Sequence, residues 1–348
     1  MKNRVFFQQA FSNLQGALVL SALPVTLITG MPQVAFSASL SAEKFEEIYV
    51  FGDSLSDIGN VFNVTSTVSP EGFPPPPYFQ GRFSNGPVWV DYLAQDLGLA
   101  PTPYMDVAGG GIPTDGINYA FGGATTGSSN TIVAGLLPGL QQQVDNFTAA
   151  NTSANQNALY VVWAGANDYL GDGVTDVSEP VNNLSTAVTS LYNVGARDIM
   201  VVNLSDLGDL PGTRGDSQIS SGFNALTSAH NSSLAASLDF LSQKPDINII
   251  PVDVNSLLNR AIADPGEFGF TNVTDSCLTE SSVCANPDEY LFWDDIHPTT
   301  AAHELVGELA FSALTPEPIP EPSAELGLLA LGALGTVSVL KRKQKKAS

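Results

Sequence analysis

Histidine and cysteine are scarce in this 348-residue chain, which has three histidines and two cysteines. Cys277 and Cys284 have no histidine near them, so they do not complete a zinc site, and we expect neither a metal nor another cofactor. Their spacing favours a small loop closed by a disulfide in an exported protein. A catalytic base has to be chosen from His230, His297 and His303.

Basic residues are also few, and seven of the thirteen lie at the two ends of the chain. Between residues 43 and 308, six bases face 32 acids, which gives that region a net charge of −26. This charge repels phosphate backbones, so nucleic acid is excluded as a partner. Hydrophobic residues make up 43% of the chain, and a single folded α/β domain is expected.

The first forty residues show the three regions of a secretory signal peptide. In order, these are two basic residues, an apolar run and a group of small residues: Lys2 and Arg4, then 16–28, then Ala35, Ser37 and Ala38. A buried helix is the weaker interpretation because Pro24 interrupts the run. We assign residues 1–39 to the signal peptide, with cleavage near Ser37 or Ser39.

The last thirty residues contain a short motif, an apolar run and a basic end: Pro320-Glu-Pro-Ser323, then 326–340, then Lys341-Arg-Lys343. This order resembles the PEP-CTERM sorting signal of Gram-negative bacteria. The resemblance implies export, transient membrane contact through this segment and removal by an exosortase-type processing enzyme. The mature protein would then lie in the periplasm, on the cell surface or outside the cell. A permanent membrane anchor is the alternative, although the run is shorter than the roughly 20 residues of a spanning helix.

Residues 42–314 form the predicted folded domain, and 315–348 the sorting segment. Within the domain, short β-branched or aromatic runs alternate with segments of helical period. The runs are residues 48–51, 117–121, 159–163 and 199–203, with a fifth candidate at 247–252. This alternation predicts a three-layer α/β/α sandwich around a parallel sheet of about five strands. Two apolar stripes are expected to be core: Leu184, Val188 and Leu191, ended by Gly195, and Phe223, Leu226, Leu234, Leu238 and Leu241.

Residues 61–87 are rich in Pro, Gly, Ser and Asn and predict an unusually long loop. Such a loop forms either one wall of a substrate cleft or a surface excursion, and the sequence leaves both open. Apolar area in or beside it would come from Phe73, Tyr78, Phe79 and Trp89.

Ser54 follows the first predicted strand, at the sheet edge where α/β proteins bind ligands. It stands in Phe51-Gly-Asp-Ser-Leu-Ser-Asp-Ile-Gly-Asn60, which resembles the first block of the GDSL, or SGNH, hydrolases. The resemblance implies a flavodoxin-like SGNH fold and makes Ser54 the nucleophile of a serine esterase or lipase. A serine needs a base within hydrogen-bond reach.

His297 is the favoured base because Pro298 can open a helix and hold it at a loop–helix junction. His230 and His303 lie in helical stretches, which favours surface or packing roles. Asp294, three residues before His297, can accept its Nδ1–H. Asp-x-x-His-Pro resembles the last family block and assigns Asp294 to the triad. Asp295 is the alternative, with a solvated or helix-capping role favoured for it.

Two further segments resemble the remaining blocks, which supply the oxyanion hole in this family. Asn118-Tyr-Ala-Phe-Gly-Gly-Ala-Thr125 implies a glycine N–H donor, with Gly123 favoured and Gly122 the alternative. Gly165-Ala-Asn-Asp168 implies that Asn167 donates from its side-chain amide, and the Ser54 N–H would be the third donor. Residues 203–208 are expected to have a structural or cleft-lining role.

The resemblance implies an exported carboxylic-ester hydrolase that needs no cofactor, and the aromatic loop favours an apolar acyl group. A polysaccharide or glycan O-deacetylase is the second choice. A third hypothesis is a noncatalytic envelope-associated binding protein on the same scaffold, because fold alone does not decide function.

Overall fold

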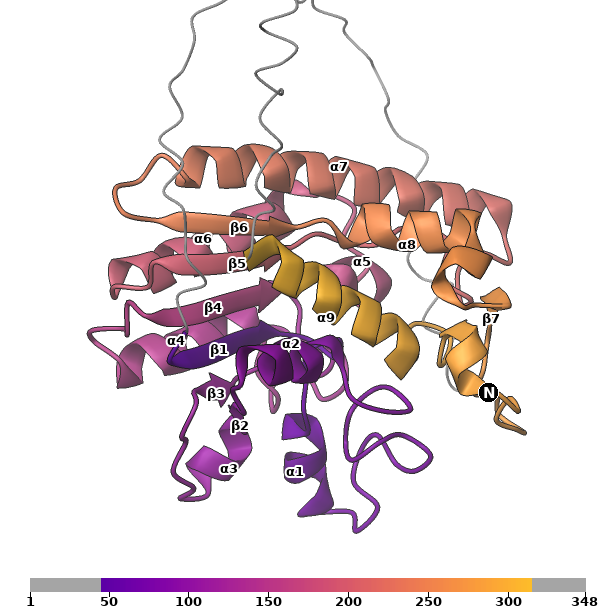
Figure 1. The fold of residues 1–348 in the computed structure, drawn as a ribbon, viewed down its shortest axis with the longest axis horizontal. Helices are drawn as coiled ribbons and strands as arrows, with labels where there is room; N and C mark the ends of the chain where they lie inside the picture. The colour runs from indigo at the N-terminus through magenta and orange to yellow at the C-terminus, as the bar shows by residue number, and fades with distance from the viewer. Residues whose placement is uncertain (1–44, 315–348) are drawn as a thin grey trace, which may run out of the picture. The chain divides into compact units, whose positions relative to one another are not determined.

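The computed structural model describes residues 45–314, so the predicted signal peptide and sorting segment lie outside the described residues. The described part is a three-layer α/β/α sandwich, which confirms the predicted fold class (Figure 1). Its parallel sheet has six strands in the order β2-β3-β1-β4-β5-β6, one more than the five runs that the sequence indicated. The central strands are β1 (Glu47–Gly52), β4 (Ala158–Trp163), β5 (Asp198–Val202) and β6 (Asn248–Val252).

The edge beyond β1 differs from the expectation, because the predicted strand at 117–121 is reduced to β3 (Ile117–Asn118). Beside it lies the equally short β2 (Thr102–Pro103). The backbone N–H groups of Tyr119 and Phe121 still bind β1. On the other side, however, the carbonyls of Asn118 and Ala120 accept the side-chain amide of Asn60, 2.9 Å from each, instead of another strand. A side chain therefore replaces strand pairing from Asn118 onward, and β3 stays short.

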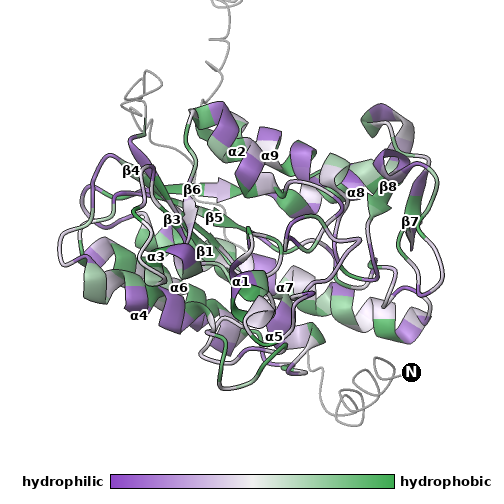
Figure 2. Ribbon diagram, turned by 90° about the horizontal axis from the view of Figure 1, so that it is seen from below, coloured by the Kyte–Doolittle hydropathy of each residue, from purple (hydrophilic) through white to green (hydrophobic). Residues whose placement is uncertain are grey.

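Helices cover both faces of the sheet (Figures 1 and 2). One layer contains α2 (Trp89–Leu97), α8 (Val254–Ala263) and α9 (Thr300–Leu314). The other contains α4 (Leu140–Ala150), α6 (Ser178–Asn193) and α7 (Ser217–Leu241). Figure 2 shows hydrophobic and hydrophilic residues alternating along these helices, as amphipathic helices on a sheet require. No helix among residues 45–314 has the length and hydropathy needed to cross a membrane.

The predicted apolar stripes are core. Leu184, Val188 and Leu191 are buried on α6, which ends at Asn193, two residues before Gly195 with its φ of +114°. In the stripe on α7, Phe223, Leu234, Leu238 and Leu241 are buried, and Leu226 is partly buried. Short elements complete the fold: α3 (Tyr104–Ala108), α5 (Ala166–Leu170), η1 (Pro265–Phe268), η2 (Pro287–Glu289) and a two-stranded sheet of β7 (Asn272–Ser276) and β8 (Tyr290–Phe292).

The long loop predicted at 61–87 is shorter than expected, since α1 occupies Asn60–Ser66. The cause is Asp57, whose carboxylate accepts the N–H groups of Gly59, Asn60 and Val61 and so satisfies the first turn. Trp89 was expected to supply apolar surface beside this loop. Instead it opens α2, is fully buried, and donates from Nε1 to Ser56 Oγ at 3.1 Å.

Cys277 and Cys284 form a disulfide that closes a small loop after β7. This loop is attached to the end of β8, because the N–H of Cys277 donates to Phe292 O at 3.1 Å and that of Leu278 donates to Trp293 O at 2.6 Å. The next residue after Trp293 is Asp294. The disulfide loop is therefore held directly beside one of the predicted site residues.

Candidate active site

Ser54 lies in a tight turn directly after β1, at the carboxyl edge of the sheet. The N–H of Ser56 donates to Asp53 O at 3.1 Å, and that of Leu55 to Asp53 Oδ1 at 3.0 Å. Glycine is needed at position 52, because a Cβ there would collide with the carbonyl oxygen of Trp163 on the adjacent β4. Close approach of the two strands thus places the serine hydroxyl at the mouth of the sheet.

His297 and Asp294 lie beside this serine, although 243 residues separate Ser54 from His297 in the sequence. The distance from His297 Nε2 to Ser54 Oγ is 2.8 Å, and the distance from His297 Nδ1 to Asp294 Oδ2 is also 2.8 Å. The other carboxylate oxygen, Oδ1, accepts the backbone N–H groups of Ile296 and His297. Asp295 is exposed and accepts instead from Ser276 Oγ at 2.8 Å. The geometry therefore groups Asp294, not Asp295, with His297.

Burial and pairing shift the pKa values of Asp294 and His297 in opposite directions. Burial alone would raise the pKa of Asp294, but the charge and hydrogen bonds of His297, followed by the Tyr78 hydroxyl, lower it below its usual range. Burial would lower the pKa of His297, but Asp294 and, more weakly, Asp53 raise it. An ionised aspartate can therefore stabilise an imidazolium formed when the histidine takes the serine proton.

The two glycines after β3 have different environments. The N–H of Gly122 is already bound to Asp57 Oδ2 at 2.9 Å. Among residues 45–314, the N–H groups of Gly123 and Ser54 have no acceptor. Gly123 has a φ of +77°, and a Cβ on it would lie 2.8 Å from Ile132 Cγ1. Asn167, in the first turn of α5, donates from Nδ2 to Ala124 O at 3.0 Å.

Ser54, Gly123, Asn167 and His297 all line one cavity of about 1000 Å³. Its lining is mainly apolar. Phe73, Pro74, Tyr78 and Phe83 come from the loop after α1, so this loop is a cleft wall and not merely a surface excursion; Phe79 is not part of the lining. Other walls are formed by Leu204 and Leu207 of the 203–208 segment and by Leu278 and Thr279 of the disulfide loop.

Two residues at this site had no assigned role in the sequence analysis. Asp53 is 1% exposed, and its burial raises its pKa to about 7, against the lowering effect of the Leu55 N–H. Tyr78 donates its hydroxyl to Asp294 Oδ2 at 2.7 Å. Asp53 is part of the Gly-Asp-Ser triplet, but nothing in the triplet indicates that its carboxyl is buried. Tyr78 was noted only for its apolar area.

The other two histidines are buried packing residues. His230 Nδ1 and the Tyr169 hydroxyl form a hydrogen bond of 2.8 Å. Burial lowers the pKa of His230 to about 4. His303 lies on α9, where burial lowers its pKa to about 3. Both are held neutral near pH 7, as packing histidines in an apolar environment should be.

Comparisons with known proteins give two family matches. The GDSL-like lipase/acylhydrolase family matches residues 48–310, and the PEP-CTERM protein-sorting motif matches residues 318–343. The second match confirms the predicted sorting signal, which indicates export by a Gram-negative sorting system.

Individual relatives are distant. Phosphatidylcholine-sterol acyltransferase of Aeromonas hydrophila is 26% identical, with 81% of this chain and 94% of the relative covered. A GDSL esterase/lipase of Arabidopsis thaliana is 28% identical, with 76% and 81% covered. Among solved structures, a lipolytic G-D-S-L family protein of Veillonella parvula is 16% identical with a TM-score of 0.45, covering 78% of this chain and 99% of that chain.

Proposed function

Since the chain belongs to the GDSL-like lipase/acylhydrolase family and is therefore an ester hydrolase, we propose that it hydrolyses carboxylic esters through a Ser54–His297–Asp294 triad and a covalent acyl-enzyme. The observation that carries this proposal is the continuous path from Ser54 Oγ to His297 Nε2 and from His297 Nδ1 to Asp294 Oδ2, with 2.8 Å at each step. Nucleophile, base and orienting carboxylate are thus within hydrogen-bond reach.

In the first half-reaction, His297 takes the proton of Ser54 while Oγ attacks the ester carbonyl. The resulting oxyanion accepts the backbone N–H groups of Ser54 and Gly123 and the side-chain amide of Asn167. Gly123 is preferred over Gly122 because the Gly122 N–H is already bound to Asp57. Preorganised donors of this kind typically contribute ~10²–10³ in rate each.

The tetrahedral intermediate then collapses, the ester C–O bond breaks, and the leaving alcohol takes the proton from His297. In the second half-reaction a water gives a proton to the same histidine and attacks the acyl-enzyme. Collapse of this second intermediate returns the proton to Ser54 Oγ and releases the carboxylic acid. His297 therefore accepts and returns the proton in both half-reactions.

The substrate class proposed is an ester with an apolar acyl chain. Support comes from the aromatic and aliphatic walls of the cavity, whose volume of about 1000 Å³ is at the upper end of the range typical of ligand sites. The relative from Aeromonas hydrophila is by name a phosphatidylcholine-sterol acyltransferase. We place the protein outside the cytoplasm, after removal of residues 1–39 and exosortase-type processing of residues 315–348.

The test uses purified protein and p-nitrophenyl esters of graded chain length, with an acetylated polysaccharide as a second substrate. Wild type is expected to react with a fluorophosphonate probe and to turn over the esters, whereas Ser54→Ala does neither. Turnover by Ser54→Ala equal to that of wild type would refute the triad. If Ser54→Ala abolishes turnover but fully preserves the protein's role in its host, the noncatalytic binding hypothesis replaces the enzymatic role.

A further inference from the structure

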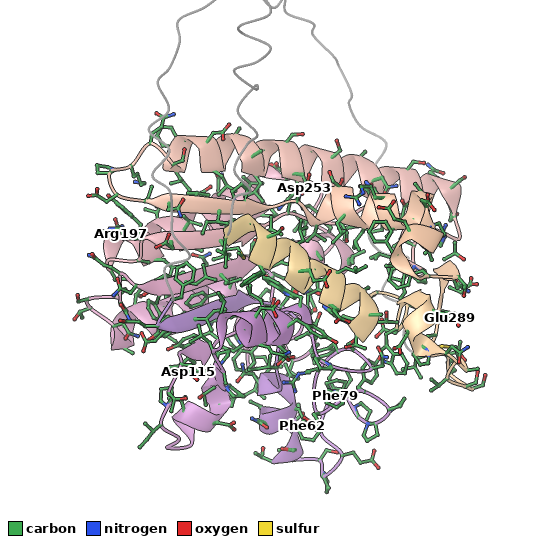
Figure 3. The ribbon with its side chains drawn as sticks, in the orientation of Figure 1. Phe62, Phe79, Asp115, Arg197, Asp253 and Glu289 are labelled. Carbon is green, nitrogen blue, oxygen red and sulfur yellow. A yellow bond between two sulfur atoms is a disulfide. The ribbon has the colours of Figure 1, made fainter. Side chains whose placement is uncertain are left out.

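A segment before α2 is attached to the loop that carries His297. This segment, residues 78–87, is called the brace below; Phe79, labelled in Figure 3, lies within it. At its start the Tyr78 hydroxyl binds Asp294. Further along, Ser84 Oγ donates to Pro298 O at 2.9 Å and Asn85 Oδ1 accepts the Thr300 N–H at 2.9 Å. The brace therefore contacts the loop on both sides of His297.

Tyr78 reaches the carboxylate oxygen of Asp294 that lies nearer to His297 Nδ1. Asp294 Oδ2 lies 2.7 Å from the Tyr78 hydroxyl and 2.8 Å from His297 Nδ1. Oδ1 is held by the backbone N–H groups of Ile296 and His297 and lies slightly farther from His297 Nδ1, at 3.0 Å. Within residues 45–314, Oδ2 has no donor except Tyr78 and His297. Rotation of the carboxylate about Cβ–Cγ is thus limited at Oδ2 by the phenol.

The aromatic rings of the brace keep this hydroxyl in place. The Tyr78 ring meets the buried Trp293 edge-on, with ring centroids 6.1 Å apart. Phe83, which is 4% exposed, packs against the His297 ring at 5.2 Å between centroids. Its ring also fills the space that a Cβ on Gly122 would need. The brace accordingly contacts the histidine and the glycine pair as well as the aspartate.

Charged and titrating groups reach His297 from several elements. Asp294 comes from its own loop, Asp53 from the end of β1 and His303 from α9. The Tyr78 phenol acts on Asp294, where its hydrogen bond helps to lower the carboxyl pKa. Burial followed by the Asp294 charge raises the pKa of Tyr78 itself, so the phenol stays protonated and remains a donor throughout the working pH range.

We propose that Tyr78 is a positioning residue of the esterase reaction, and that its hydroxyl fixes Asp294 Oδ2 as the acceptor of the His297 Nδ1–H. The inference rests on the proposed triad. It assigns the loop after α1 a supporting role beyond lining the cleft, and it links two segments that lie 216 residues apart. Loss of the hydroxyl should disturb the aspartate and histidine without removing either one.

Tyr78→Phe removes the hydroxyl and keeps the ring on Trp293. With a short-chain p-nitrophenyl ester, kcat is expected to fall about 10-fold while KM stays within about twofold. The acid limb of kcat/KM should move to higher pH. Without the Tyr78 hydrogen bond, the Asp294 carboxylate stabilises the His297 imidazolium more strongly and raises the pKa of His297. Tyr192→Phe is the matched control: its hydroxyl donates to Pro245 O at 3.1 Å, and neither constant should change.

Other outcomes overturn the inference. A higher KM with unchanged kcat means that Tyr78 only contacts substrate. A lower melting temperature with unchanged kcat and pH profile means that it only stabilises the fold. Either result removes the positioning role.

A double-mutant cycle with Asp294→Asn tests whether the effect passes through the aspartate. The readout is the second-order rate at which a fluorophosphonate labels Ser54. Tyr78→Phe should slow labelling about 10-fold in wild type but less than about threefold in Asp294→Asn, because coupled residues are non-additive. Additive losses would contradict the inference.

Ser54→Ala in the same series separates the two proposals. Activity in that variant refutes the triad and the inference together. An inactive Ser54→Ala with a normal Tyr78→Phe refutes the inference alone.

Discussion

Asp57 accepts the backbone N–H of Gly122 at 2.9 Å, across 65 residues of sequence. The same carboxylate accepts the N–H groups of Gly59, Asn60 and Val61 at the start of α1. Burial raises its pKa to about 6 against the lowering effect of these four donors. One side chain thus joins the start of α1 to the glycine pair.

Asp57→Asn should therefore damage stability and turnover together. An asparagine presents an NH₂ group where the carboxylate presents an acceptor, so at least one buried backbone donor loses its partner. We expect the free energy of unfolding to fall by about 1–3 kcal/mol, measured by chemical denaturation, and kcat to fall as Gly123 shifts. Asp145→Asn, at an exposed position of α4, is the control and should change neither quantity.

Gly123→Ala tests the proposed oxyanion donor. Both the φ of +77° and the 2.8 Å approach to Ile132 oppose a Cβ, so the amide has to move. We expect kcat to drop by roughly 10²-fold or more. Gly135→Ala is matched, because Gly135 has a φ of +75° with nothing within 4 Å of an added Cβ. It should cost about 1 kcal/mol of stability and leave kcat unchanged; equal kcat losses in the two variants would argue against the donor role.

The pH dependence of kcat/KM should follow His297, which as the proposed base acts only when neutral. Its pKa is raised above the usual 6.5, chiefly by Asp294 against the opposing effect of burial. Activity is therefore present at pH values above that raised pKa and is lost as the pH falls through it. The acid limb measured with a neutral ester should lie above pH 6.5.

Asp53→Asn should move that acid limb to lower pH. The Asp53 charge contributes to the raised pKa of His297, and an asparagine removes the charge while keeping an oxygen for the Leu55 N–H. Because the pKa of Asp53 is about 7, the charge is largely present only above neutrality. Comparison of pH profiles for wild type and Asp53→Asn measures the effect. An acid limb at the same pH in both proteins would show that Asp53 does not reach His297 electrostatically.

Reduction of the Cys277–Cys284 disulfide should alter substrate preference. The loop that it closes supplies Leu278 and Thr279 to the cavity wall. Cys277→Ser/Cys284→Ser is expected to lower the free energy of unfolding by about 2–3 kcal/mol. KM for long-chain esters should rise, while KM for acetyl esters stays the same. Treatment of wild type with dithiothreitol should reproduce the shift, and an equal rise for both esters would contradict a wall function.

Continuous apolar runs predicted the layers of the fold, and the resemblance of short motifs to the GDSL blocks predicted the grouping of Ser54, Asp294 and His297. The sequence did not predict β2, whose two residues have no pattern of their own. It also placed the residues of α1 in a loop. The carboxylate of Asp57 that satisfies the first turn of this helix gives no periodic signal in the sequence. The boundaries of the domain at 42–314 stay a prediction.

Trp89, Tyr78 and Asp53 show what a linear pattern leaves out. Trp89 looked like cleft surface because it follows the aromatic loop, yet its place in the first turn of α2 faces it into the core. The contact of Tyr78 with Asp294 spans 216 residues, and the burial of Asp53 depends on strands that pair from distant parts of the chain. Contacts of this range follow from the topology.

The separation of 243 positions between Ser54 and His297 also determines when activity can appear. The proposed nucleophile directly follows β1, but the proposed base comes just before α9, the last helix within residues 45–314. Any nascent or unfolded chain therefore has a serine without a partner. If the proposed triad is the active site, a chain exported before it folds would complete that site only outside the cytoplasm, away from the lipids of the compartment where it is made.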